Sequence, residues 1–206
     1  MTPKFGTSGL RGLVTDLTPA GAAMGTGSHI PDDRNGLKFY TRSGEITKAD
    51  EAAILAALPG ISTQDRVEKG VLETDTAALP AYAARFTDAF GPQALSGRRI
   101  GLYAHSAVGR DVLGDILRGL GAEGIELGRS DTFIPGDTEA VEAQTRAQSR
   151  AGVGAHKLDA LVSTDGDSDR PLLADETGEV VPGDVMGQIT AEALGAETVV
   201  TPISSN

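Results

Sequence analysis

The sequence contains no cysteine among its 206 residues. A disulfide framework, a thiolate metal site and a cysteine nucleophile are therefore all excluded. Aromatic residues make up only 4% of the chain and apolar residues 39%, which is low for a globular protein. Because the small residues alanine and glycine make up much of the chain, we expect a hydrophobic core with few large side chains.

Basic residues and long apolar runs are also scarce. The chain has 18 Lys and Arg against 29 Asp and Glu, a net charge of −11. This balance disfavours non-specific binding to nucleic acid or to anionic membranes, since both need basic patches. No stretch approaches the roughly 18 apolar residues of a membrane span, and no N-terminal segment resembles a secretion signal. We therefore expect a cytoplasmic protein that binds neither nucleic acid nor membrane.

The length allows one or two domains, and strands and helices alternate regularly from residue 98 onward. Strands are predicted at residues 37–40, 100–104, 124–127, 158–163 and 198–201. Helices are predicted at residues 48–58, 79–90, 110–120, 138–151 and 184–194. Thr47 is the expected N-cap of the first helix, with Asp50 three residues later. The alternation predicts βαβ layers with a largely parallel sheet.

A serine followed by a histidine lies in the polar stretch TGSHIPDDRNGLK at residues 26–38. The glycine before Ser28 allows close backbone approach, and His29 can move a proton near neutral pH. Arg34 and Lys38 supply positive charge. The proline and the run at residues 32–36 predict an exposed loop. Taken alone, the stretch fits either an ordinary turn or a phosphate-handling serine.

Three aspartates alternate directly after a predicted strand, at Asp165, Asp167 and Asp169. Three carboxylates on one short loop suit a divalent cation such as Mg²⁺, which prefers oxygen ligands. A helix–loop–helix calcium site does not fit, because a strand precedes this loop and Arg170 and a proline follow it. A solvated acidic turn is the plainer alternative. A metal loop together with an exposed serine points to metal-assisted phosphoryl transfer.

The opening stretch FGTSGLRG at residues 5–12 predicts a flexible polar loop able to wrap an anion. This stretch, the serine loop and DGDSDR at residues 165–170 resemble, in the same order, three signatures of the α-D-phosphohexomutases, the phosphomannomutase/phosphoglucomutase family. The resemblance implies an α/β fold with mixed, largely parallel sheet layers and helices on both faces. It implies an incomplete phosphoserine domain at residues 1–92 and a metal-binding domain at residues 93–206.

The resemblance also implies that hexose 1-phosphate and hexose 6-phosphate are interconverted through a phosphoserine and a 1,6-bisphosphate. Ser28 would carry the phosphoryl group, with His29 and Lys38 as candidates for general acid and base. The ligands of Mg²⁺, the implied cofactor, would be the phosphate on Ser28 and the carboxylates of Asp165, Asp167 and Asp169. The reacting oxygens and phosphate would be steadied by Arg11, Arg34 and Arg170.

The chain departs from the family pattern in what is missing. Only residues 13–25 lie where the family has several strands and helices. The family's sugar-selecting loop and its distal phosphate anchor have no counterpart. The chain is therefore expected to be either a mutase, or the part of one that carries the serine and the metal, or a non-catalytic remnant that binds Mg²⁺ or a partner. Besides the hexose phosphate, the expected partners are a second copy in a dimer or a complementing chain. A phosphatase of another α/β family, with an aspartate nucleophile, is a third reading.

Overall fold

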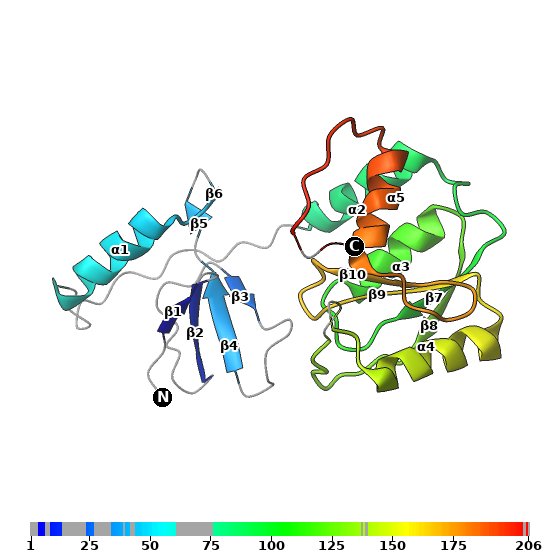
Figure 1. The fold of residues 1–206 in the computed structure, drawn as a ribbon, viewed down its shortest axis with the longest axis horizontal. Helices are drawn as coiled ribbons and strands as arrows, with labels where there is room; N and C mark the ends of the chain where they lie inside the picture. Colours follow the sequence, from blue (N-terminus) through cyan, green and yellow to red (C-terminus); the bar gives the residue numbers. More distant parts are fainter. Residues whose placement is uncertain are drawn as a thin grey trace. The chain divides into compact units, whose positions relative to one another are not determined.

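The computed structural model describes residues 4–6, 9–13, 24–26, 34–38, 40–41, 44–60, 76–136, 138, 140–203 and 205 (Figure 1). The contacts divide the chain into two compact units, Met1–Thr76 and Ala77–Asn206. The domain boundary expected between residues 92 and 93 stays a prediction.

The first unit contains a four-stranded antiparallel sheet in the order β1-β2-β4-β3. Its strands are β1 (Lys4–Gly6), β2 (Gly9–Leu13), β3 (Met24–Thr26) and β4 (Arg34–Lys38). The prediction of loops at residues 5–12 and 32–36 is therefore wrong where these strands lie. Glycine-rich segments have weak strand propensity, but cross-strand pairing satisfies their backbone hydrogen bonds.

A small hairpin of β5 (Tyr40–Thr41) and β6 (Gly44–Glu45) precedes helix α1 (Lys48–Ala57), which leads into the short helix η2 (Leu58–Gly60). The predicted N-cap of α1 is confirmed. The amide of Asp50 donates to Thr47 Oγ1 at 3.3 Å, and the amide of Thr47 donates to Asp50 Oδ2 at 2.8 Å. The Thr47 hydroxyl also donates to Asp50 Oδ2 at 2.7 Å, and this bond, together with that of the Thr47 amide, lowers the pKa of Asp50. The reciprocal pair satisfies two backbone donors that the helix itself leaves unpaired.

Replacing Thr47 by alanine is expected to loosen the start of α1. Loss of an N-cap of this kind should speed hydrogen exchange of the α1 amides roughly fivefold. Hydrogen exchange with mass spectrometry on the full chain measures this effect. Thr190→Ala is the matched control, because the Thr190 hydroxyl donates to Met186 O within another helix. Equal exchange of α1 in the two variants would contradict the capping role.

The second unit contains a mixed four-stranded sheet in the order β10-β9-β7-β8. Its strands are β7 (Arg99–Tyr103), β8 (Glu123–Leu127), β9 (Ala160–Thr164) and β10 (Pro171–Ala174). β7 is parallel to both β8 and β9, and β10 is antiparallel to β9. The predicted mixed, largely parallel sheet is confirmed.

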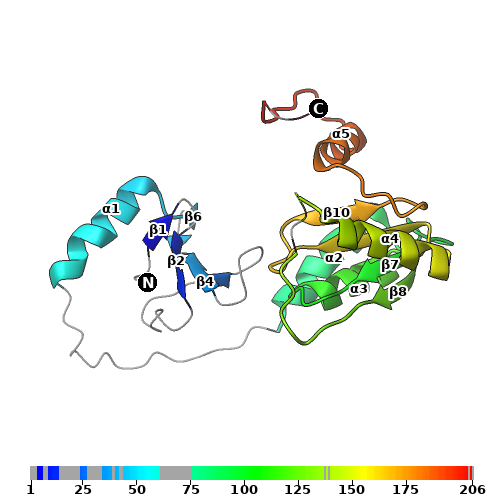
Figure 2. The same ribbon diagram turned by 60° about the horizontal axis from the view of Figure 1, so that its bottom comes forward.

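Helices α3 (Arg110–Gly119) and α4 (Ala143–His156) lie on opposite faces of this sheet (Figures 1 and 2). On the α3 face, Leu117 packs with Ile100 of β7 and with Val162 of β9. On the α4 face, Val153 packs with Leu161 of β9. Neighbouring residues of β9 thus pack into hydrophobic cores on opposite faces of the sheet, as the alternation of side chains along a strand requires. Helix α2 (Ala78–Phe90) packs against α3.

Two predictions from the sequence are wrong in this unit, the start of one helix and the presence of one strand. Helix α4 begins at Ala143, later than the expected 138, because its weak apolar stripe and missing N-cap give little signal. Residues 198–201 form no strand with the described residues, and Val200 is 93% exposed. Helix α5 (Gly183–Ala193) lies close to its predicted range. Among the described helices, none has the length and hydropathy to cross a bilayer.

Candidate metal centre

The predicted acidic loop follows β9 and brings its three carboxylates together. One carboxylate oxygen from each of Asp165, Asp167 and Asp169 lies within 4.8 Å of the others. Asp165 is buried at 1% exposure, Asp167 is half-buried and Asp169 is exposed. The cluster therefore runs from the protein interior to the solvent, and can meet an ion and a ligand from outside.

Asp165 anchors the loop. Its backbone amide donates to Arg170 O at 3.1 Å, and its Oδ1 accepts from the amides of Asp169 and Arg170 at 3.2 and 3.3 Å. Its Oδ2 is buried with no hydrogen-bond partner among the described residues. A buried, unpaired carboxylate oxygen is costly, and a bound cation relieves that cost.

The electrostatics of the loop agree with this geometry. Burial raises the pKa of Asp165, and the negative charges of Asp167 and Asp169 raise it further, against the lowering effect of the Arg170 and Asp169 amides. A hard divalent cation offsets both the burial and the repulsion. The residues present therefore fit Mg²⁺.

The loop lies at a topological switch point of the sheet. The chain passes from β7 through α3 to β8 on one side, and β9 then lies on the other side of β7. Ligands of open α/β sheets gather in the crevice outside the carboxyl ends of two such strands. Residues 104–109, which follow β7, reach the acidic loop there. Val108 N donates to Gly166 O at 3.0 Å, and His105 Nε2 donates to Thr164 O at 2.8 Å.

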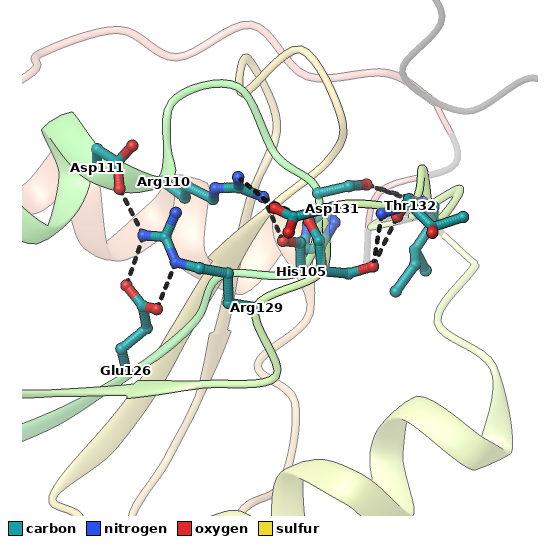
Figure 3. A network of polar contacts seen from close by, with 10 residues as sticks. His105, Arg110, Asp111, Glu126, Arg129, Asp131 and Thr132 are labelled. Atoms are coloured by element: carbon teal, nitrogen blue, oxygen red, sulfur yellow. Dashed lines mark hydrogen bonds and ion pairs between the residues drawn. The ribbon is translucent and has the colours of Figure 1, made fainter.

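A polar network holds the same edge of the sheet (Figure 3). The Arg110 guanidinium donates to His105 O and to Ser130 O, each at 2.7 Å. Arg129 bonds to Glu126 on β8 and to Asp111 on α3, which lowers the pKa of both carboxyls. Exposed pairs such as these contribute little stability. The bonds of Arg110, by contrast, tie the loops at residues 104–109 and 128–132 together.

The structure brings together only part of the predicted site. The three aspartates lie beside Arg170, whose Nε is 4.0 Å from Asp169 Oδ1. Ser28 and His29 lie outside the described residues. For Arg11, Arg34 and Lys38 the backbone alone is described: Arg11 is on β2, and Arg34 and Lys38 are on β4.

Backbone register relates these basic positions of the first unit. Arg11 lies opposite Gly36 across β2 and β4, and Thr26 lies opposite Gly36 across β3 and β4. Arg34 and Lys38 each lie two residues from Gly36. Positions two apart along a strand belong to the same face of a sheet. All three basic positions and Thr26, at the start of the serine stretch, therefore share one face.

Sequence reasoning missed the residues that support the acidic loop. His105 is 2% exposed, and its carbonyl accepts from Arg110 and from the amide of Ser130. Gly109 N donates to Ser168 Oγ at 2.9 Å. The available signal was that residues 104–109 follow a buried strand, which becomes informative only once β7 is known to neighbour β9.

Comparison with known proteins agrees with this geometry. Residues 80–178 match the family described as phosphoglucomutase/phosphomannomutase, alpha/beta/alpha domain II. The chain is 47% identical over 191 residues to a phosphomannomutase of Sinorhizobium fredii, covering 91% of this chain and 40% of that protein. It is 45% identical over 193 residues to a phosphomannomutase of Salmonella muenchen, covering 94% of this chain and 39% of that protein. The chain thus spans about two fifths of the length of these curated relatives.

A solved structure shares the fold. It is a phosphoglucomutase/phosphomannomutase family protein from Burkholderia thailandensis, with a TM-score of 0.66 and 20% identity, over 82% of this chain and 36% of that one. Identity at this level supports the fold alone. The matched domain and the relatives establish the family. Residues 80–178 belong to the phosphoglucomutase/phosphomannomutase family, the phosphohexomutases, and the chain as a whole is similar to its phosphomannomutases.

Proposed function

We propose that this chain carries the phosphoserine and metal-binding parts of a phosphomannomutase-like phosphohexomutase, with hexose 1-phosphate and 6-phosphate as substrates. One observation carries the proposal most. Asp165 presents a buried carboxylate oxygen without a hydrogen-bond partner among the described residues, beside two further carboxylates at a switch point of the sheet. The identity to curated phosphomannomutases supports the choice of substrate class.

In the proposed reaction, Ser28 donates its phosphoryl group to a free hydroxyl of the hexose phosphate. The bond from phosphorus to Ser28 Oγ breaks as the bond to the sugar oxygen forms. The sugar hydroxyl gives its proton to a base, and the leaving Ser28 Oγ takes a proton from an acid; His29 and Lys38 are the candidates for both roles. The resulting 1,6-bisphosphate returns its other phosphate to Ser28 after it turns over in the site.

Asp165, Asp167 and Asp169 would hold Mg²⁺ together with the phosphate on Ser28. When bound, Mg²⁺ neutralises charge on the phosphoryl oxygens. Arg170 lies beside this cluster, where a guanidinium can steady phosphate oxygens by paired hydrogen bonds. The shared face of Arg11, Arg34 and Lys38 in the first unit supports their proposed role in phosphate binding.

The second candidate function is Mg²⁺ binding without turnover. The observation that favours it is the acidic loop itself, because its three carboxylates fit the metal without any contribution from Ser28. The chain would then bind Mg²⁺ or a partner and leave the hexose phosphate unchanged.

The deciding experiment uses the purified chain with Mg²⁺ and a hexose 1,6-bisphosphate. We expect intact mass spectrometry to detect one added phosphate, and peptide mapping to locate it on Ser28. Conversion of mannose 1-phosphate to mannose 6-phosphate in the same preparation would favour the mutase over Mg²⁺ binding alone. Phosphate on Asp165 or Asp167, or no phosphate at any bisphosphate concentration, would overturn the phosphoserine proposal.

A further inference from the structure

Ser168 lies in the middle of the acidic loop in an unusual conformation. Its φ is +68°, a left-handed backbone that is costly for a residue with a side chain. It also lies between two candidate ligands, Asp167 and Asp169, whose mutual repulsion opposes their gathering. Something in the fold must therefore hold this loop in its shape.

The hydroxyl of Ser168 makes the contacts that do so. Its Oγ accepts from the amide of Gly109 at 2.9 Å, and Thr164 Oγ1 lies 3.2 Å away. Gly109 is the residue before α3, and Thr164 ends β9. The hydroxyl thus joins the acidic loop to the end of its own strand and to the start of a helix on the neighbouring segment.

The approach of Gly109 to Ser168 leaves no room for a larger residue. A Cβ at Gly109 would lie 2.8 Å from both Cβ and Oγ of Ser168. The backbone of Gly109, with φ −88° and ψ 2°, has the conformation of the third residue of a type I turn, which most residues with a side chain can adopt. The requirement for glycine at this position therefore comes from Ser168 and not from the local conformation.

We propose that Ser168 is a positioning residue, which holds the three aspartates in their metal-binding arrangement through its hydrogen bond with the Gly109 amide. The inference rests on the proposed metal site and adds the residue that supports it. Partners outside the ligand shell that orient the ligands typically contribute 10–100-fold to metal affinity. Ser168 does not touch the ion in this role and acts through the loop backbone.

The test measures the Kd of Mn²⁺, as a spin probe for the Mg²⁺ site, by electron paramagnetic resonance. Ser168→Gly removes the hydroxyl and keeps a backbone that accepts positive φ. We expect its Kd to rise about tenfold. Ser149→Ala is the matched control, because this buried serine donates to Thr145 O at 3.0 Å within α4 and not to a residue of the acidic loop. Its Kd should stay within about twofold of the wild type, as expected of a site whose ligand orientation is intact.

A second variant keeps the proposal falsifiable if loss of the hydroxyl alters the fold. Gly109→Ala should weaken Mn²⁺ binding about tenfold through its clash with Ser168. In the double variant Gly109→Ala with Ser168→Gly, the clashing atoms are gone, and the alanine should cost no further affinity. Hydrogen exchange of the residue 109 amide, measured without metal, should be faster in Ser168→Gly than in the wild type.

The possible outcomes distinguish the positioning role of Ser168 from the metal site itself. Equal Mn²⁺ affinity of the wild type and Ser168→Gly, with near-ultraviolet circular dichroism unchanged, would overturn the positioning role and leave the metal site standing. A wild-type chain that binds no Mn²⁺ would overturn the proposed site and this inference with it. Equal effects of Gly109→Ala in the two backgrounds would also overturn the inference.

Discussion

Asp165→Asn is expected to weaken Mg²⁺ binding strongly and, at the same time, to stabilise the metal-free chain. Asparagine keeps the shape of the side chain and the Oδ1 that accepts from the amides of Asp169 and Arg170. It removes the negative charge from the most buried member of the cluster. Loss of one of three charged ligands should weaken Mg²⁺ affinity by about a hundredfold or more.

The gain in metal-free stability follows from the direction of the pKa shift. Burial raises the pKa of Asp165 in the folded chain, so the folded state binds a proton there more readily than the unfolded state. The stability from this group is fully present below its unfolded pKa and is lost as the pH rises through the folded pKa. At neutral pH the charged carboxylate therefore opposes folding, and asparagine removes that opposition.

Isothermal titration with Mg²⁺ and thermal unfolding in a chelator measure the two effects. The same substitution at the exposed Asp115, which pairs with Arg118 on α3, makes the same change of net charge away from the loop. Asp115→Asn should leave Mg²⁺ affinity unchanged. A variant Asp165→Asn that unfolds at a lower temperature than the wild type without metal would show that the carboxylate makes a stabilising contact in the fold.

Gly178→Ala is expected to destabilise the second unit by about 3 kcal/mol, because two costs add. Gly178 has φ +82° in the turn after β10, where its amide donates to Asp175 O at 2.9 Å. A side chain there would also overlap the backbone of Arg150 in α4. Backbone cannot move aside as a flexible side chain can, so either the turn or α4 must shift.

Gly97→Ala separates the two costs. Gly97 also has a positive φ, +77°, but nothing lies within 4 Å of the position its Cβ would take. Its cost should be the conformational one alone, about 1 kcal/mol. Urea unfolding of the full chain, followed by circular dichroism, gives both values. Equal midpoints for the two variants would contradict the close packing of the turn on α4.

Local physical chemistry was enough to predict much of the second unit. Short apolar runs between turn residues predicted β7, β8 and β9, and a stretch between a polar loop and a glycine stop predicted α3. The cap at Thr47 was readable because a hydroxyl and a carboxylate three residues apart act within one turn of helix. Each of these signals depends only on neighbours along the chain.

Strands that depend on a distant partner were beyond such reasoning. β1, β2 and β4 pass through glycine-rich polar sequence and exist because they pair with one another. Residues 198–201 have good strand propensity but no partner among the described residues, and they form no strand. Pairing supplies most of the stability of a strand. Strand propensity alone therefore missed the paired glycine-rich strands and wrongly predicted a strand at residues 198–201.

For the site, the sequence by itself identified the three aspartates as candidate metal ligands, because three carboxylates that alternate after a strand fit the oxygen preference of a hard cation. Only the tertiary structure decided what holds them. The hydrogen bond between Ser168 and Gly109 joins residues 59 positions apart, and so does that between His105 and Thr164. These contacts exist because β9 returns beside β7, and strand order is set by the packing of α3 and α4 on opposite faces, which no local pattern encodes.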